Sequence, residues 1–175
     1  PAKVQFIYLS PDGSRKATPP GETPEARKLV PVKKTIGNAK DAILRLPATS
    51  AATGPAIVLA EGPETGLSIW LATGMEVWVC LGAPTPHHAA RVSLDHKLIY
   101  ARDADPAGSP ADVSFTKKIT EIRRSRPVFV ATPAEQPDLR KTDWNDILQL
   151  FGRGEVARHF AEPEEIEAQP FVEPG

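Results

Sequence analysis

The sequence predicts an α/β protein built on a roughly four-stranded, mostly parallel sheet flanked by helices, with a small β-rich N-terminal element. Four apolar segments of strand length support this, namely AIVLAE, EVWVCL, KLIYARD and PVFVAT at residues 56–61, 76–81, 97–103 and 127–132. Segments with helical features lie between them, as expected for parallel strands joined by crossover helices. The composition agrees, since 41% of the residues are hydrophobic and 25% are charged.

Proline, glycine and apolar spacing predict where the helices lie. Pro63 suits a first helical position and Gly74 a C-terminal stop, so these two residues bound the first crossover helix. We expect a short second helix over residues 87–92 and a third that begins near Pro110. The apolar residues of WNDILQLF recur at helical spacing, which predicts a helix over residues 144–151.

The distribution of turn residues, small residues and acidic residues divides the chain into three expected parts. Residues 1–50 form the β-rich element, with short strands expected at VQFIYL, LVPVKKTIG and AILRL. Residues 51–152 form the α/β domain, and the boundary is expected near residues 48–55, in a stretch of small residues. Residues 153–175 are expected to be a helix followed by an acidic tail that is disordered or laid along the surface.

The charge is segregated along the chain although the net charge is only -1. Residues 1–40 hold eight Lys or Arg against three Asp or Glu, and a second basic run extends from Lys117 to Arg126. These segments suit either a phosphate backbone or an ordinary solvated surface. The single cysteine excludes an internal disulfide, and no GxxxxGK[ST] motif supports a P-loop ATPase. No run of about 18 apolar residues occurs, so we expect a cytoplasmic protein.

Acidic residues follow the apolar strands at positions suited to a ligand site. Glu61 ends AIVLAE, so its carboxylate is expected at the carboxyl edge of the sheet, where open α/β sheets bind ligands; capping of backbone amides is the other reading. Asp103 and Asp105 end the next strand but one, and residues i and i+2 of a strand share a face. Two such carboxylates favour a divalent cation, although DADPAG also has the composition of a simple turn.

The segment KTDWND supplies two further carboxylates. Asp143 and Asp146 precede and begin the helix expected over residues 144–151. They are candidates for metal ligands, but Asp143 is equally suited to cap the helix and Asp146 to stabilise its first turn. Ligands that offer only oxygen favour Mg²⁺ or Mn²⁺ over zinc.

Taken in order, strand-EGPET-helix, strand-DADPAG and KTDWND resemble the Toprim domain of bacterial-type primases, topoisomerases, nucleases and recombination proteins. The order of the motifs is more specific than any one of them, and the resemblance covers roughly residues 56–150. The resemblance is strongest to the Toprim primases of phages and mobile elements. The first motif of those primases is often EGxET, and an aspartate-aromatic-Asn-Asp motif lies late in their Toprim domain. Cellular primases usually have an aspartate, a metal ligand, at the position where this chain has Thr65. Either Glu64 substitutes for this aspartate or this chain lacks that metal ligand.

This resemblance implies a Rossmann-like Toprim fold and metal-dependent nucleotidyl transfer, the synthesis of RNA primers during DNA replication. Glu61 then matches a metal ligand or general acid/base, and Asp103 and Asp105 match the metal ligands of the family's DxD motif, so these three residues form the expected catalytic set. The expected metal ligands, for Mg²⁺ or Mn²⁺, are Glu61, Asp103, Asp105, Asp143 and Asp146. The residues expected to bind nucleic acid or nucleotide are Lys33, Lys34, Arg102 and Lys117.

The expected partners are single-stranded DNA, nucleoside triphosphates and a replicative helicase in the same or another chain, with no membrane. Because the flanking zinc-binding module of a primase is absent, we expect a fragment with weak activity alone. Two alternatives stay open: a Toprim nuclease with nearly the same acids, and a non-catalytic nucleic-acid or protein-binding Toprim module.

Overall fold

The computed structural model describes residues 4–12, 17, 33–37, 42–49, 54–137, 139 and 141–166. The chain divides into two units, Pro1–Ala42 and Ile43–Gly175, so the division falls before the boundary expected near residues 48–55. The first unit contains an antiparallel pair of strands, β1 (Val4–Ile7) and β2 (Lys33–Ile36), in which Val4 lies opposite Ile36. The strand expected at VQFIYL is present as β1, and the strand expected at LVPVKKTIG is present over Lys33–Ile36, while residues 29–32 of that segment lie outside the described residues.

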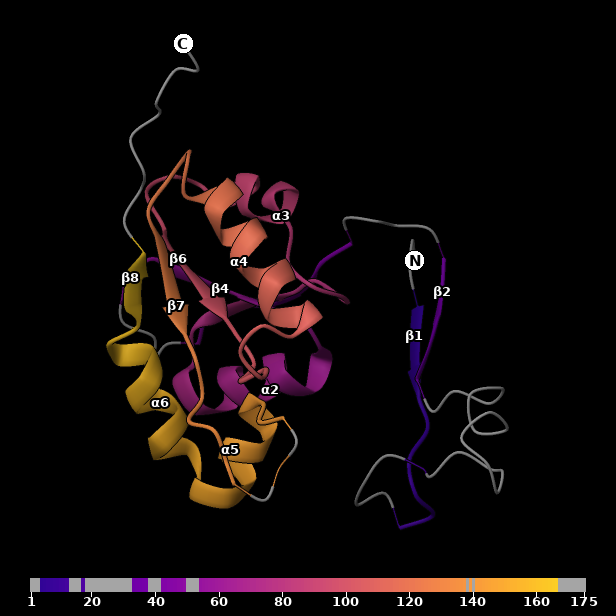
Figure 1. Ribbon diagram of the computed structural model, residues 1–175. Coiled ribbons are helices and arrows are strands. Elements are labelled where there is room, and N and C mark those ends of the chain that lie inside the picture. The colour runs from indigo at the N-terminus through magenta and orange to yellow at the C-terminus, as the bar shows by residue number, and fades with distance from the viewer. Residues whose placement is uncertain are drawn as a thin grey trace. The chain divides into compact units, whose positions relative to one another are not determined.

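The second unit is organised around one six-stranded sheet (Figure 1). Its strands, in spatial order, are β3 (Leu44–Leu46), β5 (Glu76–Val79), β4 (Ala56–Ala60), β6 (Lys97–Ala101), β7 (Val128–Ala131) and β8 (Glu164–Ile166). The central four strands are parallel to one another, and the two edge strands are antiparallel to their neighbours. The predicted four-stranded parallel sheet is confirmed and is wider by one antiparallel strand at each edge.

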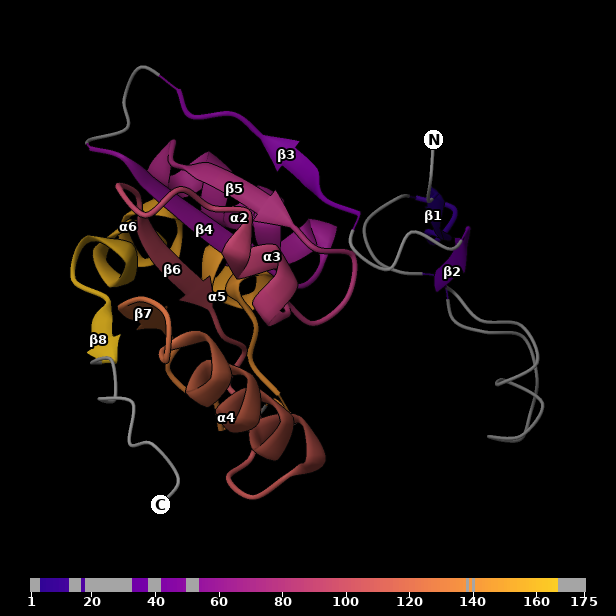
Figure 2. The same ribbon diagram turned by 90° about the horizontal axis from the view of Figure 1, so that it is seen from above.

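The helices form a layer on each face of this sheet (Figures 1 and 2). The helices α2 (Pro63–Thr73), α5 (Trp144–Phe151) and α6 (Arg153–Ala161) cover one face. The helices α3 (Pro86–Ala90) and α4 (Pro110–Ile122) cover the other. Gly74 ends α2 in the left-handed conformation with φ 67°, as its predicted role as a stop requires.

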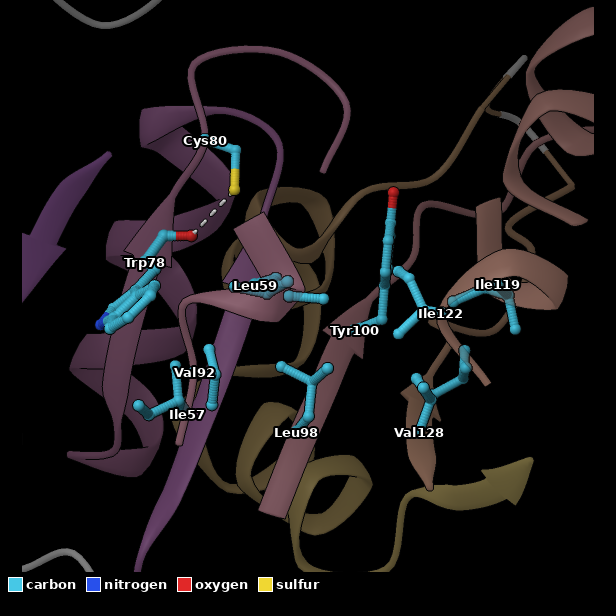
Figure 3. Packing of buried hydrophobic residues seen from close by; sticks show 12 residues of the cluster. Ile57, Leu59, Trp78, Cys80, Val92, Leu98, Tyr100, Ile119, Ile122 and Val128 are labelled. Carbon is cyan, nitrogen blue, oxygen red and sulfur yellow. Dashed lines mark hydrogen bonds between the residues drawn. The ribbon is translucent and has the colours of Figure 1, made fainter. Parts of the chain in front are cut away.

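Alternate residues of the central strands supply two cores, because successive side chains of a strand point to opposite faces. In β4, Ile57 and Leu59 face α3 and α4, whereas Val58 and Ala60 face α2, α5 and α6. The strands are apolar on both faces, as expected for a parallel sheet covered on both sides. In Figure 3 Tyr100 of β6 lies beside Ile122 of α4, and both belong to the core that faces α3 and α4.

The edge strands were the least predictable part of the sheet. The strand expected at AILRL is present as β3, but it pairs with β5 and so belongs to the second unit. Strand β8 lies in the segment expected to be a helix and an acidic tail, and Glu164 lies opposite Val130 of β7. Edge strands carry charged residues that discourage further pairing, and such composition hides them in the sequence.

Gly66 allows α2 to approach the sheet closely. A Cβ at this position would meet Cγ2 of Val79 on β5 in sub-van der Waals contact. We expect Gly66→Ala to lower the free energy of unfolding by about 1–3 kcal/mol, the usual cost of overpacking. Gly154→Ala in α6 is the matched control, since nothing lies within 4 Å of its added Cβ. Urea unfolding that shows the same stability for both variants would contradict this packing.

Candidate metal and phosphate site

The acidic residues predicted from strand ends gather at the carboxyl edge of the sheet. Glu61 follows β4 directly, and Asp103 follows the neighbouring parallel strand β6 by two residues. The backbone at Glu61 is fixed by the turn after β5, where the Gly82 amide donates to the Glu61 carbonyl at 3.1 Å. Leu81 of that turn has a φ of 53°, a strained conformation for a branched side chain.

A short antiparallel bridge brings the KTDWND segment to the DADPAG segment. The Ala104 amide donates to the carbonyl of Thr142 at 2.9 Å, and these two residues form an isolated β-bridge. Thr142 is almost fully buried, and its hydroxyl accepts a hydrogen bond from the Gln136 amide at 3.0 Å. Residues flanking the bridge on the two segments therefore meet in space although nearly 40 positions of sequence separate them.

Lys141 lies between the two aspartates of the DxD motif. Its Nζ is 2.9 Å from Oδ2 of Asp103 and 3.1 Å from Oδ1 of Asp105. The two aspartate side chains are only 13% and 16% exposed, whereas that of Lys141 is 44% exposed. The two carboxylates converge on an ammonium group of the chain itself, and their predicted role as ligands of a divalent metal ion stays a prediction.

The electrostatics of the pair reflect burial and crowding of negative charge. Burial raises the pKa of Asp103 above its ordinary value, and the charges of Asp143 and Glu61 raise it further, while Lys141 offsets only part of this. Burial alone would lower the pKa of Lys141, but hydrogen bonds and charges from Asp103 and Asp105 outweigh burial and raise it. The site therefore attracts additional positive charge.

Asp143 and Asp146 form a capping box at the start of α5. Oδ1 of Asp143 accepts from the amides of Asn145 at 2.8 Å and Asp146 at 3.0 Å. Oδ2 of Asp146 accepts in return from the Asp143 amide at 2.9 Å. The capping roles left open by the sequence are confirmed, and a metal-binding role for these two residues stays a prediction.

A pocket of about 210 Å³ opens beside the carboxylates. It is lined by Glu61, Ala83, Tyr100, Ala101, Arg102, Asp103, Asp105, Ala111, Ser114, Phe115, Lys118 and Lys141. The lining combines the basic residues Arg102, Lys118 and Lys141 with acidic ones, a combination that suits a phosphate bridged to a cation. The pocket is contained within the second unit.

Two of the four predicted phosphate-binding residues belong to this unit. Arg102 lines the pocket, but its guanidinium donates to Asp112 at 2.5 Å and lies 4.5 Å from the Phe115 ring centroid. Lys117 is exposed on α4 and does not line the pocket, whereas its neighbour Lys118 does. Lys34 is exposed on β2 of the first unit, and the side chain of Lys33 lies outside the described part of the structure. The phosphate-binding roles of these four residues stay predictions.

Two residues with nucleophilic atoms near the pocket are poorly suited to covalent chemistry. Burial raises the pKa of Tyr100 far above its ordinary value, and its ring packs edge-on against Phe115 at 5.2 Å. Burial also raises the pKa of Cys80 to about 12, and its thiol points to the Trp78 carbonyl (Figure 3). A thiol and a phenol in such surroundings stay protonated at neutral pH.

The oxygen atoms of Asp103 and Asp105 fit Mg²⁺ or Mn²⁺, because they already converge on one cation. Within the described residues no group of three His, Cys, Asp or Glu side chains is placed to hold a metal ion. The five carboxylates predicted as ligands therefore do not form one cluster. Magnesium commonly uses one or two carboxylates together with waters and substrate phosphates, so the pair alone is a sufficient protein contribution.

The sequence reasoning missed the residues that assemble the site. Lys141 is the first residue of the motif KTDWND. The only local signal for its role was its position two residues before Asp143, the aspartate expected to cap a helix. Thr142 makes the bridge to Ala104, which no local pattern indicates. Thr65, at the position where cellular primases usually have an aspartate, is buried in the first turn of α2 and is only 5% exposed.

Comparison with known proteins identifies the family. The sequence profile of the Toprim domain matches residues 56–154, more than half of the chain. The chain belongs to the Toprim domain family. No curated protein sequence matches it. In this Toprim domain the matched segment begins at β4 and runs through α5, so it contains Glu61, the DxD pair and the capping box.

Solved structures with a similar fold include primases. A structure of the DnaG catalytic core covers 94% of this chain at 12% identity with a TM-score of 0.55, and the chain spans 53% of that structure. The Aquifex aeolicus primase, solved as its zinc-binding and RNA polymerase domains, covers 65% at 21% identity with a TM-score of 0.50, and 27% of it is spanned. The Toprim domain thus shares the fold of primase catalytic cores and spans about half or less of those chains.

Proposed function

We propose that this Toprim domain is part of a DNA primase core that joins nucleotides into RNA primers on single-stranded DNA. The observation that supports this most strongly is the convergence of Asp103 and Asp105 on one cation at the carboxyl edge of the sheet. Membership of the Toprim family and the fold shared with primase cores support the same reading. A nuclease would use the same carboxylates, so the assay below must separate synthesis from cleavage.

Each acidic side chain has a position that suits a role. Asp103 and Asp105 would hold the divalent cation, Mg²⁺ or Mn²⁺, and both side chains are mostly buried. Glu61 is exposed on the same pocket, where its carboxylate assists the cation site or accepts the proton of the attacking hydroxyl. A bound Mg²⁺ or Mn²⁺ supplies positive charge that neutralises the triphosphate and the leaving pyrophosphate.

The basic residues of the pocket suit phosphate binding. Lys118 lines it from α4, and Arg102 presents a guanidinium that Asp112 and Phe115 hold in place. Lys117, exposed on the same helix, extends the positive charge beyond the pocket. Such contacts follow a nucleic-acid backbone without reading its sequence, and they suit a single-stranded template or an incoming nucleoside triphosphate.

A replicative helicase, in the same or another chain, is the expected partner of a primase that works during DNA replication. Among the described residues, no helix is long and apolar enough to cross a membrane.

The test is to incubate the chain with circular single-stranded DNA, the four ribonucleoside triphosphates and Mn²⁺. New short RNAs that depend on the metal would support the primase function. Cleavage of the DNA without RNA synthesis would replace it with a nuclease function. If neither occurs but the chain binds single-stranded DNA in a salt-dependent manner, the non-catalytic module becomes the better account.

Asp143 provides a separate test, because capping and metal binding make different demands on its side chain. Asp143→Ala should cost about 0.5–2 kcal/mol of stability by removing the cap, whereas Asp143→Asn caps as well and should change stability by only a few tenths. If the negative charge also supports the cation, Asp143→Asn should weaken Mn²⁺ binding in calorimetric titration. Binding equal to that of the parent would leave Asp143 with capping alone.

A further inference from the structure

Lys141 occupies the place that a metal would take. The oxygens that accept its ammonium, Oδ2 of Asp103 and Oδ1 of Asp105, come from the two side chains that converge on the pocket. Both aspartates are mostly buried, so in the absence of a metal their negative charges need a partner. The ammonium of Lys141 provides this charge compensation.

A divalent ion and this ammonium are not compatible at the same two oxygens. Magnesium lies about 2.0–2.1 Å from its oxygen ligands, which places it inside the space between the carboxylates. Like charges held that close repel strongly in a partly buried site. The two cations therefore compete for these oxygens.

The surroundings of Lys141 allow its side chain to leave without unfolding the loop. The backbone beside it is anchored by the bridge between Thr142 and Ala104, but the side chain itself is 44% exposed. Lys141 also borders a second pocket of about 360 Å³, together with Pro106 and Glu135. The ammonium can move toward this pocket and away from the aspartates.

We propose that Lys141 is the resident cation of the Asp103 and Asp105 pair, and that a divalent metal binds there only by displacing the Lys141 ammonium. Lys141 thus lowers the affinity for metal and stabilises the metal-free site. This inference rests on the proposed function in one respect, namely that the same two aspartates hold the metal.

The first experiment measures Mn²⁺ affinity by calorimetry for the parent chain, Lys141→Met and Lys141→Arg. Removal of the competing ammonium should tighten Mn²⁺ binding by about tenfold or more in Lys141→Met. Lys141→Arg keeps the charge and should stay within about threefold of the parent. Lys97→Met, at the opposite end of β6, is the matched charge-removal control and should also leave the affinity unchanged. Thermal unfolding of each variant verifies that it folds.

The second experiment uses the unmodified chain and so does not depend on any variant. Acetic anhydride labels free amines, and peptide mass spectrometry follows the labelling of Lys141 with and without Mn²⁺. Displacement predicts that Mn²⁺ increases labelling of Lys141 while that of Lys97 is unchanged. Labelling of Lys141 that stays constant or falls would overturn the proposal.

The outcomes separate this inference from the proposed function. If the parent and Lys141→Met bind Mn²⁺ with equal affinity, the aspartates hold metal but Lys141 does not compete, and only the inference fails. Weaker binding in Lys141→Met would also overturn it, because Lys141 would then assist the metal. If no variant binds Mn²⁺ at all, both the inference and the proposed metal-dependent function fail.

Discussion

Replacing Asp103 and Asp105 together by asparagine should reduce metal-dependent activity on nucleic acid by at least about a hundredfold. Each substitution keeps the shape of the side chain but removes the charge that binds the cation. The loss of one group that stabilises a transition state commonly costs a hundredfold to a thousandfold in rate. The assay is RNA synthesis on single-stranded DNA, or cleavage of it, with Mn²⁺ held constant.

The fold should survive this double substitution. The ion pairs with Lys141 are lost, but asparagine side chains keep hydrogen-bonding oxygens toward it, and the partly buried negative charges that needed a partner are removed at the same time. Burial, and to a lesser extent the charges of Asp143 and Glu61, raise the pKa of Asp103, so removing its charge offsets part of this loss. Asp95→Asn, in an exposed loop before β6, is the matched control. Activity that survives in the double variant, or that is lost equally in Asp95→Asn, would contradict the assigned site.

Trp144→Ala should destabilise the second unit by about 3–5 kcal/mol, the usual cost of truncating a buried aromatic residue. Trp144 is fully buried and lies 4.7 Å from Phe160 and 5.4 Å from His159, measured between ring centroids. It therefore joins α5 to α6 beneath the sheet. Because α5 begins at Asp143, loss of this packing should also loosen the segment that carries Lys141. Urea unfolding measures the effect.

Trp144→Phe distinguishes packing from hydrogen bonding at the same position. The indole Nε1 is buried and has no hydrogen-bond partner among the described residues. Phenylalanine keeps most of the apolar volume and removes this polar group, so we expect a cost well below that of alanine. If Trp144→Phe were as destabilising as Trp144→Ala, apolar packing would not explain the contribution of Trp144, and the indole would have to make a specific polar interaction.

The central sheet was predictable because its strands are apolar on both faces and are separated by clear turn and helix signals. Helix α5 coincides with the predicted range 144–151, since its apolar residues follow the helical period. The edge strand β8 was not predictable, because its sequence Glu-Glu-Ile is acidic and is stabilised by pairing with β7. A local sequence pattern predicts a strand that buries an apolar face of its own. The formation of β8 depends instead on pairing with its neighbour β7.

The sequence indicated the acidic residues of the pocket and Arg102, but neither Lys141 nor Lys118. Strand ends indicated Glu61 and the two aspartates of the DxD motif, because the ends of parallel strands meet at one edge of the sheet. The position of Lys141 depends on the bridge from Thr142 to Ala104, a contact between distant segments that has no local signature. For a similar reason Lys118, rather than Lys117, lines the pocket: the docking of α4 decides which lysine faces it.

A metal site at Asp103 and Asp105 is tested most directly by titrating Mn²⁺ into the parent chain and into the Asp103→Asn, Asp105→Asn variant. Electron paramagnetic resonance measures the concentration of free Mn²⁺ at each step of the titration. The account predicts saturable binding to the parent that is lost in the variant while both proteins unfold with similar stability. Binding that is not saturable in the parent, or that persists unchanged in the variant, would contradict a metal site at Asp103 and Asp105.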